Sequence, residues 1–171
     1  METIFARKAR FASVSCRLFT VYGERAREDH ALIALIARAT VDQRPFQIWG
    51  TGTQVRNWTY VGDIVRGMVL AAERINDASS INLGCEERIT VRRAAELIRE
   101  YCGRSGEIEF LPEMPVGPAN RVASARLAKT VLGWEPLVSF EQGLYRTIEW
   151  YRNSVDLAVT ADELSARLLK D

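Results

Sequence analysis

The sequence predicts an α/β protein in which at least some strands pair in parallel. Short runs rich in β-branched and aromatic residues alternate along the chain with segments whose apolar residues recur at the helical period. Glycines and helix-capping residues stand at the ends of these segments. Because alternating strands and helices favour parallel pairing, we expect the early part of the chain to belong to a larger sheet and the later part to form a small mixed lobe.

The first half of the chain is predicted to begin with a buried strand followed by a buried helix. Residues 14–22 are rich in β-branched and aromatic residues and end at Gly23. Asp29 is expected to cap a helix over residues 30–40, which is apolar nearly all round and should be buried on more than one side. The next elements are a strand at 45–49 with a turn at Gly50 and Gly52, an extended piece at 56–61, and a helix that Asp63 caps, with Ile64, Met68, Ala71, Ala72 and Ile75 at the helical period.

The second half continues the alternation and ends in a charged tail. The predicted elements begin with a strand at 80–83 closed by Gly84, a helix from Thr90 to Gly103 and a half-exposed strand at 107–111. A proline-rich loop at 112–120 then leads to a short helix at 125–132, which Gly133 ends. The last two elements are a helix from the Ser139/Gln142 capping box to about Tyr151 and a tail helix that Thr160 and Glu163 begin. We therefore expect a core over residues 1–152 and a charged helical tail over residues 153–171.

Composition excludes several classes of protein. The 171 residues suit one domain, and a formal net charge of +1 gives no electrostatic reason to expect a nucleic-acid or membrane-surface partner. The longest apolar run, residues 31–37, is too short to cross a bilayer, and the N-terminus has no continuous apolar stretch typical of a signal peptide. The three cysteines, Cys16, Cys85 and Cys102, form no CxxC pair, which predicts reduced thiols in a cytoplasmic protein rather than a disulfide framework or a zinc site.

Stretches spread over most of the chain carry a resemblance to one enzyme family. They read RLFTVYG at 17–23, WGTGTQVRNWTYVGD at 49–63, INLG at 81–84, GPANR at 117–121, LGWEP at 132–136 and GLYRTIEWY at 143–151. In this order they resemble the extended short-chain dehydrogenase/reductase family, whose NAD-dependent members act on nucleotide sugars as epimerases, 4,6-dehydratases and decarboxylases. The resemblance covers about residues 10–152. It implies the C-terminal part of a Rossmann-type sheet together with a small α/β substrate-binding lobe.

Arg56 and Arg121 are the candidate ligands of a diphosphate. A nucleoside diphosphate sugar carries two negative charges there, and guanidinium groups present a planar fork to phosphate oxygens. Arg56 follows a glycine-rich turn, and Arg121 follows a proline- and glycine-rich loop that could fold over a ligand. The resemblance implies that arginines at these positions bind the diphosphate. The residues by themselves leave open that both arginines are solvated or structural.

The base side of a nucleotide has candidate residues in two predicted strands. Trp49 and Gln47 point to the same face of a strand, where an aromatic ring can stack on a base. Asn82 lies in an otherwise apolar strand, where a buried amide needs partners. The resemblance implies that an asparagine here helps to hold the nucleotide. Trp49 as a core residue and Asn82 as a structural residue remain alternatives.

The end of the first strand is expected to face the cofactor and the sugar. The resemblance implies that Phe19 lies near the nicotinamide and that Thr20 lies near the sugar, at a position that is often Asn in the family. A threonine offers a single oxygen as donor and acceptor where an amide offers separate donor and acceptor atoms, so we expect sugar recognition to differ at this point. His30, the only histidine, stands at a helix start, where such a residue is more often a surface or capping residue than a catalytic one.

The sequence lacks the motifs on which the chemistry of the family depends. A GxxGxxG turn would place the cofactor pyrophosphate at a helix N-terminus, and a YxxxK pair would supply a tyrosine base with a lowered pKa. The only GxG, at residues 50–52, opens no predicted helix, and no tyrosine is followed four residues later by lysine. Met1 and Glu2 resemble the residues just after that lysine. We therefore expect no catalysis and no NAD binding by this chain alone.

Three interpretations of the chain follow, in order of preference. It is a fragment or split half of an enzyme that binds a nucleoside diphosphate sugar and pairs with a missing N-terminal half. Alternatively, it is a non-catalytic module that binds a nucleotide sugar or forms a homo-oligomer. In the third, it is an unrelated α/β domain.

Overall fold

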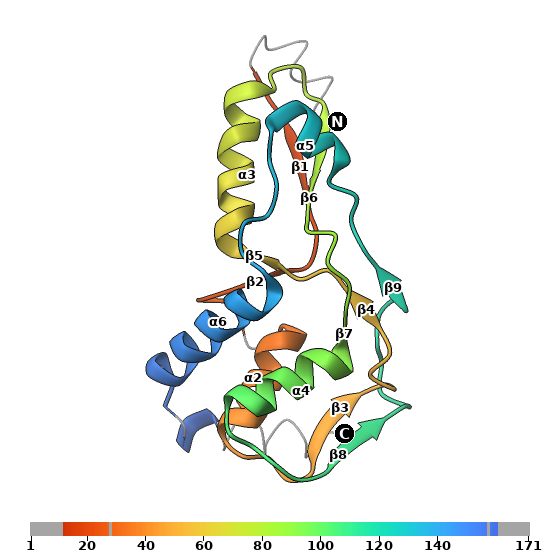
Figure 1. The fold of residues 1–171 in the computed structure, drawn as a ribbon, viewed down its shortest axis with the longest axis vertical. Helices are drawn as coiled ribbons and strands as arrows, with labels where there is room; N and C mark the ends of the chain where they lie inside the picture. Colours follow the sequence, from red (N-terminus) through yellow and green to blue (C-terminus); the bar gives the residue numbers. More distant parts are fainter. Residues whose placement is uncertain (1–11, 28, 157, 161–171) are drawn as a thin grey trace. The chain divides into compact units, whose positions relative to one another are not determined.

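The computed structural model describes residues 12–27, 29–156 and 158–160, which form two compact units (Figure 1). Of the described residues, the first unit comprises those within 12–22, 56–88 and 121–140, and the second comprises those within 23–55, 89–120 and 141–160. Strands paired in parallel and helices occur in both units, which confirms the predicted α/β class.

The first unit is built on two parallel strand pairs. β1 (Ser15–Leu18) pairs with β6 (Ser80–Leu83), and β2 (Val21–Tyr22) pairs with β5 (Thr59–Tyr60). The single strand predicted over residues 14–22 was wrong, because the chain changes partner after β1. The Phe19 amide donates to the Leu83 carbonyl, whereas the Thr20 carbonyl accepts from Thr59.

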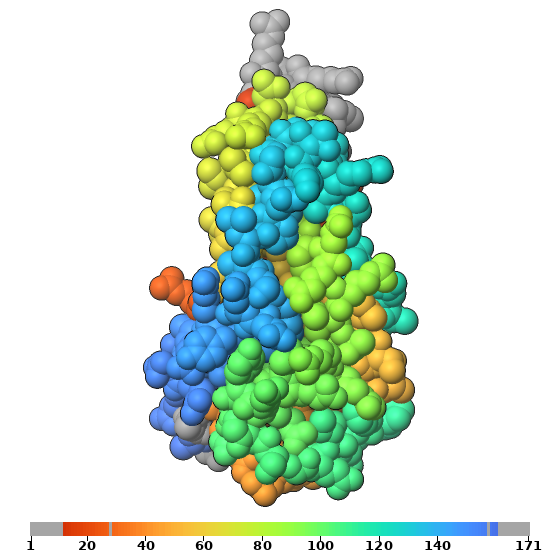
Figure 2. All heavy atoms as spheres, in the orientation of Figure 1, coloured from red at the N-terminus to blue at the C-terminus, as the bar shows by residue number. Residues whose placement is uncertain are grey.

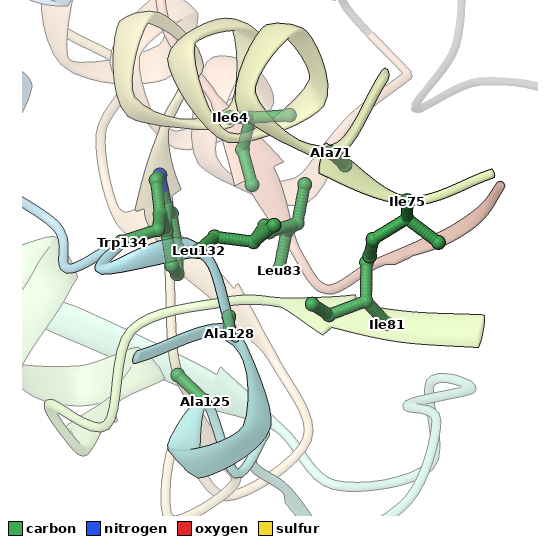
Figure 3. Close-up of a cluster of buried hydrophobic side chains, with 9 residues drawn as sticks. All are labelled: Ile64, Ala71, Ile75, Ile81, Leu83, Ala125, Ala128, Leu132 and Trp134. Atoms are coloured by element: carbon green, nitrogen blue, oxygen red, sulfur yellow. The ribbon is translucent and has the colours of Figure 1, made fainter. Parts of the chain in front are cut away.

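Two helices cover one face of the β1–β6 pair. Figure 1 shows α3 (Val61–Arg74) running along these strands, with α5 (Arg126–Leu132) packed against β6. Between them lies the core of the unit, in which the apolar face of each strand meets apolar residues of both helices (Figure 3). Gly67 lets α3 approach closely, since a Cβ there would lie 2.8 Å from Trp134 Nε1. The cluster consists of Ile64, Ala71, Ile75, Ile81, Leu83, Ala125, Ala128, Leu132 and Trp134.

Asp63 does not cap α3, contrary to the prediction. The helix begins two residues earlier, at Val61, and Tyr60 occupies the N-cap position. The buried Asp63 carboxylate instead accepts hydrogen bonds of 3.0 Å from the amides of Leu137 and Val138 and from Arg66. Asp63 therefore ties the first turn of α3 to a distant loop, because a buried carboxylate needs donors wherever it lies.

The second unit packs helices around another parallel strand pair. β3 (Phe46–Trp49) pairs with β8 (Ile108–Leu111), and α2 (Ala31–Thr40) packs against α4 (Val91–Tyr101). Most of α2 is buried, as predicted from its composition, but its N-cap residue is His30 rather than Asp29, and His30 makes no side-chain capping bond.

The remaining elements of the described chain are three short strands and a helix. The strands β4 (Val55–Arg56), β7 (Ile89–Thr90) and β9 (Asn120–Arg121) form a sheet of order β7-β4-β9, and the helix is α6 (Phe140–Ser154).

Several predicted helix ends are confirmed. The Thr90 hydroxyl accepts from the Arg93 amide at the start of α4, and Gly133 ends α5 in the left-handed conformation that glycine favours. The strand predicted at 80–83 matches β6.

Thr160 lies in a short helical stretch, whereas Glu163 and most of the predicted tail helix lie outside the described residues, as do Met1 and Glu2. Within the described residues, no helix combines the length and apolar character needed to cross a membrane.

Candidate functional site

The carboxyl ends of β1 and β6 lie side by side in the first unit. Phe19 follows β1, Gly84 follows β6, and the Phe19 amide donates to the Leu83 carbonyl at 3.1 Å. In α/β sheets, ligands bind outside the carboxyl ends of parallel strands. This edge of the first unit is therefore the place to look for a ligand site.

Gly84 brings separate segments of the chain together at this edge. A Cβ at Gly84 would lie 2.8 Å from the Ala123 side chain, 3.0 Å from Phe19 Cβ and 3.2 Å from Asn57 Nδ2. Real Cβ atoms essentially never come within 3.0 Å of another heavy atom, so the contact with Ala123 favours glycine at this position. Arg56 is the neighbour of Asn57 in sequence, and Arg121 lies two residues before Ala123. The close approach at Gly84 thus brings the backbone segments that carry both predicted arginines near the carboxyl end of β6.

A buried polar network holds the segment next to Arg56. Asn57 is fully buried and donates from Nδ2 to the Cys85 carbonyl at 2.7 Å, while the Cys85 amide donates to Thr59 Oγ1 at 2.9 Å. The Cys85 thiol donates to the Trp58 carbonyl, and burial raises the pKa of this thiol, so it is not an activated nucleophile. The sequence analysis did not select Asn57. The available indication was an amide side chain in an extended segment, directly after Arg56 and before the aromatic residues Trp58 and Tyr60.

Arg56 and Arg121 form a cationic pair. They lie on the adjacent strands β4 and β9, and Arg56 is half-buried whereas Arg121 is exposed. Burial, followed by the positive charge of Arg121, lowers the pKa of the Arg56 guanidinium. Both effects disfavour the charged form, and an anion placed against the pair would relieve them. The structure therefore brings together the two residues that the sequence assigned to a diphosphate.

The remaining predicted residues of the first unit lie near the same strand ends. Phe19 directly follows β1, and Asn82 lies in β6 opposite Arg17, on the strand face away from Ile81. The Thr20 hydroxyl is shielded from solvent and has no hydrogen-bond partner among the described residues. A sugar would reach this hydroxyl only after neighbouring side chains move.

Trp49 and Gln47 belong to the second unit. As predicted, they lie on the same face of β3, where Trp49 is 39% exposed. Gln47 donates to Glu109 on the paired strand at 2.8 Å and accepts from Gln43. The amide of Gln47 is therefore already engaged, whereas the ring of Trp49 is open to a stacking partner.

Tyr22 is the buried tyrosine nearest to these strand ends in sequence, and it is not a candidate base. Its hydroxyl donates to the Phe140 carbonyl at 2.9 Å. Burial, followed by nearby negative charges, raises the pKa of Tyr22 well above its usual range. A catalytic tyrosine base requires the opposite shift, because it must lose its proton near neutral pH.

A family model assigns the chain to a family of enzymes. Residues 1–84 match the model of the NAD dependent epimerase/dehydratase family. The chain is 34% identical to UDP-glucuronic acid decarboxylase 1 of Xenopus tropicalis over 141 residues, which is 82% of this chain and 33% of that protein. It is 32% identical to UDP-glucuronate 4-epimerase of Thermodesulfobacterium geofontis over 142 residues, 82% of this chain and 43% of that protein.

The chain belongs to the NAD-dependent epimerase/dehydratase family. Solved structures agree with this assignment. UDP-glucuronic acid 4-epimerase from Bacillus cereus, in complex with UDP-4-deoxy-4-fluoro-glucuronic acid and NAD, is 32% identical, with a TM-score of 0.80 over 89% of this chain and 49% of that one. UDP-glucose 4-epimerase from Thermotoga maritima with UDP-glucose is 29% identical, with a TM-score of 0.82 over 90% of this chain and 50% of that one. The family member described here therefore spans half or less of these relatives.

Proposed function

We propose that this chain is the substrate-binding half of a nucleotide-sugar epimerase or decarboxylase and that it binds a nucleoside diphosphate sugar. The observation that carries the proposal is the pairing of Arg56 with Arg121 beside the carboxyl ends of parallel strands. Two guanidinium groups can each present a planar fork to one phosphate, so the pair suits a diphosphate better than a single phosphate. A uridine nucleotide is the preferred ligand, because the similar structures hold UDP sugars.

The other predicted residues receive roles in the same proposal. Trp49 is assigned to stacking on the base together with Gln47 on the same face of β3, and Asn82 is assigned to the nucleotide. Thr20 is assigned to the sugar, which its shielded hydroxyl contacts only after neighbouring side chains move, and Phe19 is assigned to the nicotinamide. These roles rest on the family resemblance.

We further propose that this chain alone neither binds NAD nor catalyses a reaction. The similar Bacillus cereus enzyme was solved with NAD, but the present sequence contains neither a GxxGxxG turn nor a YxxxK pair. When NAD is bound in the family, it supplies reversible hydride transfer. The residues of this chain hold and orient the sugar nucleotide. Free thiols at Cys16, Cys85 and Cys102 support a cytoplasmic location for the chain.

Binding of UDP tests the assignment of the arginines. We expect the chain to bind UDP weakly, and Arg56→Ala and Arg121→Ala each to weaken binding about tenfold or more, since a charge-assisted hydrogen bond contributes about 1.5–3 kcal/mol. Isothermal titration calorimetry with UDP and with pyrophosphate measures both effects. Arg152→Ala, on the exposed face of α6, is the matched control.

Two results would contradict this proposal. Equal UDP affinity in the wild type and in both arginine variants means that the diphosphate binds elsewhere. A folded wild-type chain that binds no nucleotide means that this half is not a working nucleotide site. Pyrophosphate bound as tightly as UDP would assign Trp49 and Asn82 structural roles instead.

The second candidate function is a dimer-forming module, which a stripe of apolar residues on α3 favours. Val65, Met68 and Val69 are 54%, 44% and 53% exposed, and Ala72 is exposed beside them. This spacing of three and four residues forms one continuous helix face, and side chains of α3 reach the surface in Figure 2. Such a face can pack against the same face of an antiparallel second copy.

We therefore expect the purified chain to self-associate through α3. Val69→Lys should shift the population towards monomer, because a charge placed in the stripe opposes burial of its apolar neighbours. Sedimentation velocity measures the shift, and Val159→Lys, which changes an equally exposed valine of the other unit, is the control. A strictly monomeric wild type with a sharp unfolding transition would rule out this second function.

A further inference from the structure

The second unit contains a pocket of about 430 Å³ that is rich in arginine. It lies between the end of α2, the start of β3 and the segment that follows α4. Basic side chains outnumber acidic ones in its lining, and Pro45 and Phe46 add an apolar wall. The basic residues are Arg38, Arg44, Arg99 and Arg104, and the acidic residues are Asp42 and Glu107.

Arg38 carries a positive charge that the described residues leave uncompensated. Its side chain is half-buried, and its Nε is shielded from solvent without a hydrogen-bond partner in the described part of the chain. Burial lowers the pKa of this guanidinium. The nearest acid in sequence, Asp42, is already bonded to Arg44 at 2.7 Å. A partly buried cation without a partner is costly, so the pocket favours an anionic ligand.

Hydrogen bonds to backbone carbonyls hold the side chains of Arg99 and Arg104 in place. Arg104 donates from Nε and Nη2 to the carbonyls of Ala39 and Thr40, each at 2.9 Å. Arg99 donates from Nη2 to the Gly106 carbonyl at 2.7 Å, and its guanidinium lies 5.7 Å from the centre of the Phe46 ring. Among the described residues, Nη1 of Arg99 has no hydrogen-bond partner, whereas Nη1 of Arg104 pairs with Asp42 at 3.8 Å. Donors held in this way lose little freedom when an anion arrives.

A second pocket in the first unit shows the contrast. Its volume is about 340 Å³, and its charged lining residues are Arg74 and Asp77, which balance each other. Arg74 also donates to the Leu132 carbonyl at 2.7 Å. That pocket therefore has no excess of positive charge, and it gives no reason to expect an anion.

We propose that the pocket of Arg38, Arg44, Arg99 and Arg104 binds a phosphate group, either as free phosphate or as a phosphomonoester. Clustered guanidinium groups match the oxygens of a tetrahedral anion, and the apolar wall beside them suits the carbon part of a small metabolite. This site uses none of the residues assigned to the nucleotide sugar.

Calorimetric titration with inorganic phosphate and with glucose 6-phosphate tests this site. The titrations use a chain in which Arg56→Ala and Arg121→Ala have removed the other cationic pair. In this background we expect Arg38→Gln and Arg44→Gln each to weaken phosphate binding about tenfold. Arg44 is exposed, so its substitution leaves folding intact, and Arg27→Gln is the control because Arg27 is an exposed arginine of the same unit.

Removal of a negative charge from the pocket provides a second check. Asp42→Asn removes a negative charge from the pocket. Asparagine, like aspartate, tolerates the left-handed backbone conformation of residue 42, whose φ is 57°. We expect this variant to bind phosphate more tightly. Tighter binding of glucose 6-phosphate than of phosphate identifies a metabolite as the ligand, whereas equal binding identifies free phosphate. Phosphate affinity unchanged by both Arg38→Gln and Arg44→Gln, or lost on removal of Arg56 and Arg121 alone, overturns the proposal.

Discussion

Trp134→Ala is expected to lower the free energy of unfolding of the first unit by about 3–5 kcal/mol. Trp134 is fully buried in the cluster between α3, α5 and β6, and its Nε1 donates to the Asp63 carbonyl at 2.9 Å. Alanine would leave a large cavity and remove the hydrogen bond to the Asp63 carbonyl. The cavity adds to the lost transfer free energy, because the surrounding backbone relaxes only in part.

Urea denaturation followed by far-UV circular dichroism measures the change. Trp134→Phe separates the contributions, since it keeps much of the apolar volume and removes only the hydrogen bond, so we expect a smaller loss. Trp49→Ala serves as the matched control, because its ring is substantially exposed and its removal creates no comparable cavity. A loss for Trp134→Ala no larger than that for Trp49→Ala would show that the cluster in Figure 3 does not stabilise the unit.

The same core shows what the sequence could and could not predict. Local patterns predicted β6, and the presence of α3 although not its start, because apolar periodicity and closing residues depend on neighbours in sequence. The role of Asp63 depends on Leu137 and Val138, which lie more than seventy residues away. Its N-cap-like position in sequence therefore predicted a local bond, whereas a distant loop supplies the actual partners.

The break between β1 and β2 has a similar origin. Residues 14–22 have the composition of one strand, and nothing local marks Phe19 and Thr20 as an interruption. The interruption arises because β6 ends opposite Leu18 and β5 offers the next partner to Val21. Strand ends depend on the partner strand, which composition does not reveal.

The sequence was enough to nominate residues for the candidate site, but not to predict how they are arranged. Arg56 and Arg121 follow glycine- and proline-rich loops, which indicated exposed and well-positioned guanidinium groups. Their pairing on β4 and β9 required the fold, because sixty-five residues separate them in sequence. Conversely, Gln47 was predicted to face a base, and the fold engages its amide with Glu109.

No turnover of UDP-glucuronic acid or UDP-glucose is expected from the purified chain when NAD is added. Epimerisation and decarboxylation in this family need a hydride acceptor held in place and a base that accepts a proton. The chain contains no GxxGxxG turn to receive the cofactor pyrophosphate and no YxxxK pair to lower the pKa of a tyrosine. The buried Tyr22 cannot replace that base, because its pKa is shifted upwards.

Ion-exchange chromatography of the sugar nucleotides after overnight incubation measures turnover, with a full-length UDP-glucuronate 4-epimerase as the positive control. Conversion above that of heat-inactivated protein contradicts the prediction only if it is lost in Arg56→Ala, since a contaminating epimerase would not respond to that substitution. The titrations with UDP show whether a chain without turnover still binds the nucleotide. A chain that binds UDP through Arg56 and Arg121 without converting the sugar separates recognition from chemistry, as expected if recognition depends on residues of this half and chemistry depends on motifs that it lacks.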